Sequence, residues 1–464
     1  MRSIVLALPV MAGLIVACQN ADPKDPEGFA VLPEGFDDVE IGRVLHLSPL
    51  PAHATDPTNR WSDDEGAARF GQLLFFDERL SKGEQHSCAT CHLPDHGFAD
   101  AHTVSEGVAR LERHVPTLLN IAHHRWFFWD GRADSLWSQA CAVIEAPLEM
   151  AGTRLGTAHL IASDDRLRER YEAMFGPLPS LQDTERFPLV GRPVPKDDPA
   201  YGDDGSHGKP GASGQEHHTH AAGNTFFHPH ERNWNAMTDA DRAAVNDVFA
   251  NVGKALAAYQ HRLVAIDSPF DRFVRGLRSG DAEDLAALSP SAQRGLHLFV
   301  GEANCFLCHS GPLLSDREFH DLRLPPGDGP IDDLGRQHGL EKVVADPFNG
   351  RGAWSDDVVA GSEMLDYLPQ HHHANFEFKT PSLRNVALSP PYMHQGQFAT
   401  LRDVVDFYSE LEGARTSPPS VETVVVPLRL DEEQKQDLVA FLESLTGTLP
   451  AKTWRTPFQA ESNE

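Results

Sequence analysis

The pattern in this chain that could do chemistry is Cys-x-x-Cys-His, which occurs twice. Each copy has two cysteines three positions apart with a histidine directly after them: Cys88, Cys91 and His92 in the first, and Cys305, Cys308 and His309 in the second. This spacing is typical of covalent c-type haem attachment, in which both thiols bond to the porphyrin and the histidine binds the iron. A thiol redox pair or half of a zinc site would also fit a single copy. Because two copies occur in a chain with only six cysteines, we expect one haem at each motif.

The segments before the two motifs predict how each haem is held. An apolar face of helical period runs through residues 65–76, before the first motif. A helix start at Ser289 and Pro290 leads into residues 292–300, before the second motif. A helix followed by Cys-x-x-Cys-His is the opening of a small cytochrome c domain. The repeat therefore predicts two related haem domains with a boundary near Leu285.

The rest of the chain predicts a mainly α-helical protein. Helical periodicity marks residues 135–144, 154–175, 239–263, 401–408 and 431–445. No run of alternating apolar residues indicates a large sheet. We therefore predict two cytochrome c-like haem domains packed together, the first over residues 61–285 and the second over residues 286–464.

A polar, glycine-rich insertion interrupts the first domain at residues 193–232. It contains six histidines: His207, His217, His218, His220, His228 and His230. Neutral imidazoles bind transition metals, but histidine tracts without acidic or cysteine partners at set spacing are weak indicators of a site. We interpret the insertion as a solvated segment without a fixed metal, and the tract His371-His372-His373 in the same way.

The N-terminus has the features of a bacterial export signal over residues 1–17. A basic start precedes an apolar run from Ile4 to Ala17, which is too short to span a bilayer. Small residues before Cys18 resemble a lipoprotein processing site, and ordinary cleavage after Ala17 is the alternative. We favour the lipoprotein because Cys18 has no other role, and we expect a periplasmic protein anchored to an envelope membrane. Residues 18–60, rich in Pro, Asp and Gly, are predicted to be a flexible tether.

The chain is strongly acidic. It has 68 acidic and 40 basic residues, a formal net charge of -28 and a pI near 5.2. This charge argues against nucleic acid as a partner, because the phosphates would be repelled. A basic partner is compatible with the charge, although an acidic, soluble surface alone would account for it.

Five further segments give the chain a resemblance to a known family. They read Leu74-Phe75-Phe76-Asp77, Phe128-Trp129-Asp130-Gly131-Arg132-Ala133, Glu149-Met150, Thr380-Pro381-Ser382-Leu383-Arg384-Asn385 and Pro391-Tyr392-Met393-His394. In this order, from about Glu65 to Thr446, they resemble the landmarks of the bacterial di-haem cytochrome c peroxidases and the related MauG-type enzymes. The histidine-rich insertion lies outside the resemblance.

The resemblance implies a peroxidatic first haem and an electron-transfer second haem. It places Trp129 between the haems, where its ring could carry an electron, and Gln139 and Glu149 in the distal pocket over the first haem. Cleavage of a peroxide needs a proton to leave one oxygen and reach the other, and a desolvated carboxyl such as that of Glu149 can move it. From the residues alone, Trp129 would be a core residue and Glu149 an exposed carboxylate at a helix end.

Two departures from the peroxidase pattern concern the sixth ligands of the haem irons. The loop from Ser105 to Arg110 has no histidine, and Val108 stands where a blocking histidine could have been. We therefore expect the first haem to be open without reductive activation. At the second haem, Tyr408 falls at the position of the methionine ligand, which resembles the MauG-type arrangement. A tyrosinate is a hard anion that stabilises ferric iron, and we favour it over the competing ligand Met393.

The family also holds a calcium ion between the haems through an asparagine side chain and two backbone carbonyls. Ser389 and Pro391 match the carbonyl positions, but His114 occupies the asparagine position. Imidazole is a poor ligand for a hard cation that prefers oxygen. A calcium site is therefore an open prediction.

Cys141 is the sixth cysteine and lies two residues after Gln139. A reactive thiol near an oxidising iron would be a liability or a sensor. We favour the alternative, in which Cys141 is a small, buried apolar residue.

The sequence thus predicts a di-haem peroxidase that reduces hydrogen peroxide to water at the first haem. A small cytochrome c or a cupredoxin would deliver electrons through the second haem. The alternative is MauG-type oxidation of a partner protein through a high-valent di-haem state, which Tyr408 and the missing histidine favour. A non-catalytic di-haem electron carrier, with both irons six-coordinate, is the third interpretation.

Overall fold

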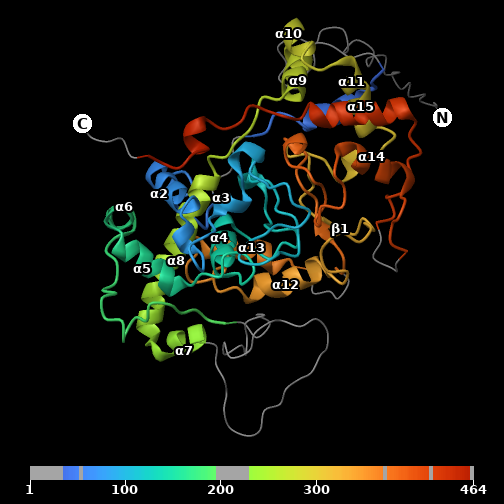
Figure 1. Cartoon of the computed structure of the whole chain (residues 1–464). Coiled ribbons are helices and arrows are strands. Elements are labelled where there is room, and N and C mark those ends of the chain that lie inside the picture. Colours follow the sequence, from blue (N-terminus) through green and yellow to red (C-terminus); the bar gives the residue numbers. More distant parts are fainter. Residues whose placement is uncertain (1–34, 52–55, 195–228, 369–373, 417–421, 460–464) are drawn as a thin grey trace, which may run out of the picture.

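A computed structural model describes residues 35–51, 56–194, 229–368, 374–416 and 422–459 of the chain. These residues fold mainly into helices, and the strands β1 (Phe319–His320) and β2 (Phe378–Lys379) form one short antiparallel pair. Figure 1 shows most of the helices in two groups, with irregular loops between them. Among the described helices, none is long and apolar enough to cross a membrane. The predicted mainly α fold is confirmed.

Each group of helices surrounds its own hydrophobic core. The first core, which contains Phe70 and Phe249, is built by α2 (Glu65–Phe75), α4 (Leu136–Glu145), α5 (Arg154–Ser163), α6 (Asp165–Phe175), α7 (Pro229–Ala236) and α8 (Asp239–Gln260). The second core, which contains Phe299 and Phe441, is built by α1 (Asp38–His46), α9 (Pro269–Ser279), α10 (Ala282–Leu285), α11 (Pro290–Val300), α14 (Leu401–Glu410) and α15 (Glu432–Glu443). The remaining helices are α3 (Cys88–Cys91), α12 (Arg336–Ala345) and α13 (Val358–Asp366).

Each domain is organised around one close helix crossing, in which α2 packs against α8 and α11 packs against α15. At each crossing a glycine lets the two backbones touch. A Cβ on Gly71 would lie 1.9 Å from the Ala255 carbonyl oxygen, and a Cβ on Gly295 would lie 1.9 Å from the Asp437 carbonyl oxygen. No side chain fits at that distance. The matching crossings confirm that the two domains share one fold, as the two haem motifs predict.

Gly295→Ala should therefore destabilise the second domain. The added methyl group must push α11 and α15 apart, which we expect to lower the free energy of unfolding by about 1–3 kcal/mol. Gly42→Ala is the matched control, because Gly42 also lies in a helix but has nothing within 4 Å of its Cβ position. Thermal unfolding of the two purified variants measures both effects. Equal melting temperatures would contradict this account of the crossing.

The repeat between the two domains also includes a loop with a β-bridge and the helix that follows this loop. The β-bridge between Phe127 and Ala133 recurs 265 positions later between Tyr392 and Phe398. The helices that follow these bridges, α4 and α14, begin with the same separation. Positions 265 residues apart in these two segments are therefore structurally equivalent.

The two domains contact each other through two backbone hydrogen bonds, and the residues of one bond are equivalent to those of the other under the spacing of 265 positions. The His114 N–H donates to the His394 carbonyl, and the Lys379 N–H donates to the Trp129 carbonyl, both at 2.8 Å. His114 is equivalent to Lys379, and Trp129 is equivalent to His394. The junction between the domains therefore has approximate twofold symmetry.

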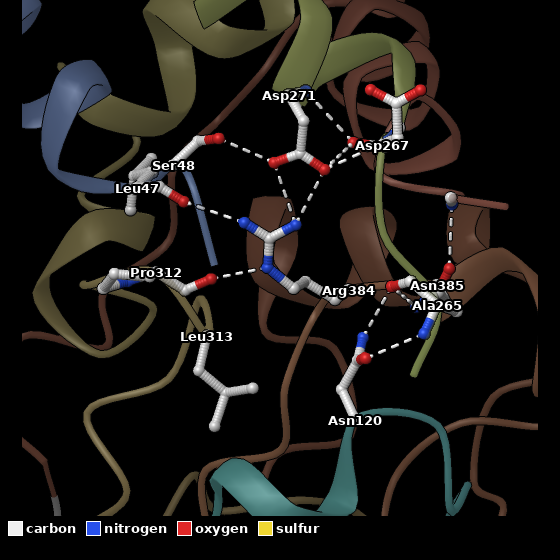
Figure 2. Close-up of polar contacts among 12 residues, drawn as sticks. Leu47, Ser48, Asn120, Ala265, Asp267, Asp271, Pro312, Leu313, Arg384 and Asn385 are labelled. Atoms are coloured by element: carbon white, nitrogen blue, oxygen red, sulfur yellow. Dashed lines mark hydrogen bonds and ion pairs between the residues drawn. The ribbon is translucent and has the colours of Figure 1, made fainter. Parts of the chain in front are cut away.

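Figure 2 shows another contact at the junction that is made by a pair of equivalent residues. The side-chain amides of the equivalent residues Asn120 and Asn385 both donate to the Ala265 carbonyl, at 2.8 and 3.3 Å. Close by, the Arg384 guanidinium donates to the Leu47 carbonyl at 3.1 Å. Because Leu47 directly follows α1, this bond ties the N-terminal helix to the second domain.

The predicted flexible tether over residues 18–60 is wrong for its described part. Helix α1 begins with a capping box between Asp37 and Glu40, and Val44 and Leu47 are buried in the second core. The composition of this segment does not indicate a helix. Only a few of its residues are apolar, and they pack against a core whose other residues come from much later in the chain.

The predicted domain boundary near Leu285 is also wrong. Helix α9 precedes this boundary, but its Phe270 belongs to the second core. Conversely, Phe348 lies within the predicted second domain and packs in the first core. Residues 61–285 and 286–464 are therefore not the two structural domains. Periodicity marks a helix without saying which core its apolar face enters.

Several predicted segments lie outside the described residues. These are the export signal over residues 1–17, Cys18, the tract His371-His372-His373 and most of the insertion over residues 193–232. The last residues of that range begin α7, whose Trp234 is buried in the first core. The predicted insertion therefore includes the start of a helix at Pro229.

Candidate functional site

Both haem motifs present a histidine in the form that binds iron. The Nδ1 of His92 donates to the Phe98 carbonyl, and the Nδ1 of His309 donates to the Leu314 carbonyl, each at 2.9 Å. These bonds leave the Nε2 of each ring available for iron. Burial lowers the pKa of both imidazoles, which favours the neutral, metal-binding form.

A cavity lies beside the first motif. It is lined by Cys88, Cys91 and His92, by apolar side chains, and by polar ones that include Gln139 and Glu149. Two thiols and an imidazole at the wall of a largely apolar cavity fit a covalently attached haem. The structure thus brings the two predicted distal residues together with the first haem motif.

Glu149 is an acidic group within this cavity. Its carboxylate accepts a hydrogen bond from Nη2 of Arg132 at 3.2 Å, and the Arg132 guanidinium lies over the Phe128 ring, 3.5 Å from its centroid. Burial raises the pKa of Glu149, and the Arg132 charge opposes that rise. The carboxyl is therefore partly buried and held in place, as proton transfer requires.

The loop after the first motif lies against the backbone of Glu149. The Val108 N–H donates to the Glu149 carbonyl at 2.8 Å, and the Ala109 N–H donates to the Leu148 carbonyl at 3.0 Å. The Val108 side chain is exposed. This loop therefore supports the distal carboxylate and presents no imidazole to the cavity.

Tyr408 lies beside the cysteines of the second motif. Burial raises the pKa of its phenol, and the nearby Cys305 and Cys308 raise it further. The equivalent residue of α4, 265 positions earlier, is Val143, which lines the first cavity. An aliphatic side chain cannot bind iron, so the two haem sites differ at this position. The role of Tyr408 as a ligand stays a prediction.

Trp129 lies at the junction of the two domains. Its indole Nε1 donates to the His114 carbonyl at 2.8 Å, and its ring lies 6.4 Å from the His394 ring in an edge-on arrangement. Met393, the competing ligand for the second haem, precedes His394 in a turn and has a φ of 72°. Trp129 thus touches both domains, as a route for electrons between them would require.

Cys141 is buried within the first core. Its side chain is 2% exposed, and its thiol donates to the Phe249 carbonyl at 3.6 Å. A Cβ on Gly253 of α8 would lie only 2.5 Å from the sulfur. Burial also raises the pKa of the thiol, which keeps it protonated. These contacts support the structural interpretation of Cys141.

Arg113 and Arg132 are not among the predicted site residues, but both bind Asp130, and Arg132 also binds Glu149. Arg113 donates to both carboxylate oxygens of Asp333 at 2.7 Å and to Asp130 at 2.6 Å. Burial would raise the pKa of Asp130, but Arg132 and Arg113 hold it well below its usual range. Asp130 and Arg132 belong to a segment that carries the family resemblance, which was the available signal for this network.

Two Cys-x-x-Cys-His motifs in a pair of cytochrome c-like domains define a di-haem c-type cytochrome. The model of the family described as di-haem cytochrome c peroxidase matches residues 65–190.

The chain also resembles individual members of this family. It is 31% identical to the cytochrome-c peroxidase IdrP1 of Pseudomonas sp. (strain SCT), over 87% of this chain and 86% of that protein. It is 32% identical to the methylamine utilization protein MauG of Methylorubrum extorquens, over 81% of this chain and 76% of that protein. The fold superposes with a TM-score of 0.55 on the crystal structure of a MauG-like protein associated with microbial copper homeostasis, which is 24% identical, over 86% of this chain and 95% of that chain. The chain therefore belongs to the di-haem cytochrome c peroxidase and MauG family, which implies two covalent haems.

Proposed function

We propose that this chain reduces hydrogen peroxide to water at its first haem, with electrons delivered through its second haem. The observation that carries the proposal is the difference between two equivalent positions. Val143 lines the first cavity, whereas Tyr408 lies beside the second motif. A haem with one open face can bind peroxide, and a haem with two protein ligands transfers electrons.

When bound, the first haem supplies an iron that can bind peroxide, and the second supplies an iron that relays electrons. The Glu149 carboxylate would take a proton from one peroxide oxygen and return it to the other, which leaves as water. Arg132, 3.2 Å from that carboxylate, keeps it oriented. The Gln139 amide, which lines the same cavity, orients the peroxide. Two electrons and two further protons complete the conversion of one peroxide into two waters.

A small cytochrome c or a cupredoxin is the proposed electron donor. The formal net charge of -28 favours a donor with a basic docking face, because opposite charges speed encounter. Trp129, between His114 and His394, is the proposed link for electrons between the haems. The predicted export signal over residues 1–17 supports a location in the bacterial periplasm, with a lipid on Cys18 as the proposed membrane anchor.

The ferric spectrum and stopped-flow mixing with hydrogen peroxide test this proposal. The ferric holoprotein should contain high-spin iron whose spectrum shifts when cyanide binds. It should also turn over peroxide when a reduced small cytochrome is supplied. A purely low-spin protein that ignores both cyanide and peroxide would be an electron carrier instead.

MauG-type oxidation of a partner protein is the second candidate function. Tyr408 favours it, because a tyrosinate ligand stabilises oxidised iron at the second haem. The same stopped-flow experiment separates the two functions. Negligible turnover with reduced donors, together with a long-lived spectral change after peroxide is added, would favour oxidation of a protein.

The rate of peroxide cleavage should rise as the pH increases through the pKa of Glu149. The carboxyl acts as a base only when it is ionised, and burial raises its pKa above that of an ordinary glutamate. The rise should therefore be centred at a higher pH than for an exposed glutamate. Single-turnover rates across the pH range measure this profile. If the same profile persists in Glu149→Gln, another group is responsible for it.

A further inference from the structure

His114 is buried at the junction of the two domains, with 4% of its surface exposed. Its Nδ1 donates to the His102 carbonyl at 2.8 Å. The backbone of Ser389, from the opposite side of the junction, lies near the imidazole and raises its pKa, and the Asp100 carboxylate lies 3.8 Å from Nδ1. The imidazole therefore already fills a space surrounded by oxygen atoms from both domains.

These residues do not fit a calcium ion. Calcium takes about six to eight oxygen ligands and has little affinity for imidazole nitrogen. Of the ligand set implied by the family resemblance, only the carbonyls of Ser389 and Pro391 are retained, and the backbone of Ser389 lies near the His114 side chain. The third position offers a ring nitrogen in place of an amide oxygen.

The equivalent site on the other side of the approximate twofold axis is also occupied by a basic side chain. Lys379 stands 265 positions after His114, and its Nζ lies 3.3 Å from Nδ1 of His124, which stands 265 positions before Ser389. Lys379 is buried. His114 therefore faces Ser389, and Lys379 faces His124, which is the residue equivalent to Ser389. In each case a basic side chain crosses the junction to the same position in the other domain.

We infer that the His114 imidazole replaces the interdomain calcium ion of this family, so that protein contacts alone hold the junction between the haems. This replacement concerns how the two domains are held together. It goes beyond the proposed function, because the metal content of the junction does not depend on which reaction the first haem supports.

The calcium content of the holoprotein tests the inference directly. After purification in buffer that contains calcium, followed by gel filtration, wild-type protein should hold substoichiometric calcium by atomic emission. Treatment with EGTA should leave the absorption spectra and midpoint potentials of both haems unchanged. One retained equivalent of calcium, or a spectral change with EGTA that calcium reverses, would overturn the inference.

His114→Asn supplies the amide oxygen that the family uses at this position. In calorimetric titrations with calcium chloride, this variant should bind calcium about a hundredfold more tightly than wild type, or better. His102→Asn is the matched control: it removes an exposed imidazole but keeps the carbonyl that accepts from His114, and it should behave as wild type. Equal calcium affinities of wild type and His114→Asn would overturn the inference. The wild-type measurements decide alone if the variant does not fold.

Discussion

Replacing Glu149 with glutamine should slow the cleavage of hydrogen peroxide by about 10²- to 10⁴-fold, the usual contribution of a positioned acid–base group. Glutamine has nearly the same shape and can still accept a hydrogen bond from Arg132. It cannot carry a proton from one peroxide oxygen to the other. Haem attachment should be intact, because Glu149 lies outside the Cys-x-x-Cys-His motif. Single-turnover stopped-flow absorption of the first haem measures the rate.

Glu106→Gln is the matched control for this experiment. Glu106 is an exposed residue in the loop that follows the first motif, next to Gly107, which lines the same cavity. The substitution removes the same charge near the same haem and should leave the rate unchanged. Equal slowing in the two variants would indicate a general effect of charge. Equal rates in wild type and Glu149→Gln would remove Glu149 from the mechanism.

The helices around each haem motif can be predicted from residues that are neighbours in the chain. Asp64 and Asp431 cap the first turns of α2 and α15, and each helix carries an apolar stripe. Helix α1 could not be predicted in this way. Val44 and Leu47 are buried only because the second core, whose remaining buried members begin at Phe270, folds against them. The same reason explains the misplaced domain boundary.

The same distinction between neighbouring and distant residues applies to the candidate site. The two haem motifs are contiguous, so their chemistry can be predicted from spacing alone. The bond between Arg132 and Glu149 joins residues from either side of α4, and no local pattern encodes it. The equivalence of Val143 and Tyr408 becomes visible only when the repeat of 265 positions is read from the structure. Family resemblance identified Tyr408, but its comparison with Val143 depends on the fold.

Tyr408→Phe should remove the oxygen ligand of the second haem and raise its midpoint potential by on the order of 100 mV or more. A phenolate stabilises ferric iron, and the phenyl ring retains the packing of the tyrosine without its oxygen. Burial raises the pKa of this phenol, so its ionised form depends on the charge of a bound ferric ion. The low-spin ferric signal of the second haem should disappear from the electron paramagnetic resonance spectrum. Spectroelectrochemical titration measures the change in potential.

Three further variants separate the ligand from its surroundings. Tyr408→Met supplies a thioether, which should restore a low-spin haem at a higher potential than in wild type. Tyr392→Phe removes a hydroxyl from a partly buried tyrosine that packs against the second core, and it should change neither the spectrum nor the potential. Met393→Leu tests the competing ligand. Loss of the low-spin signal in Met393→Leu, with no change in Tyr408→Phe, would transfer the ligand role from Tyr408 to Met393.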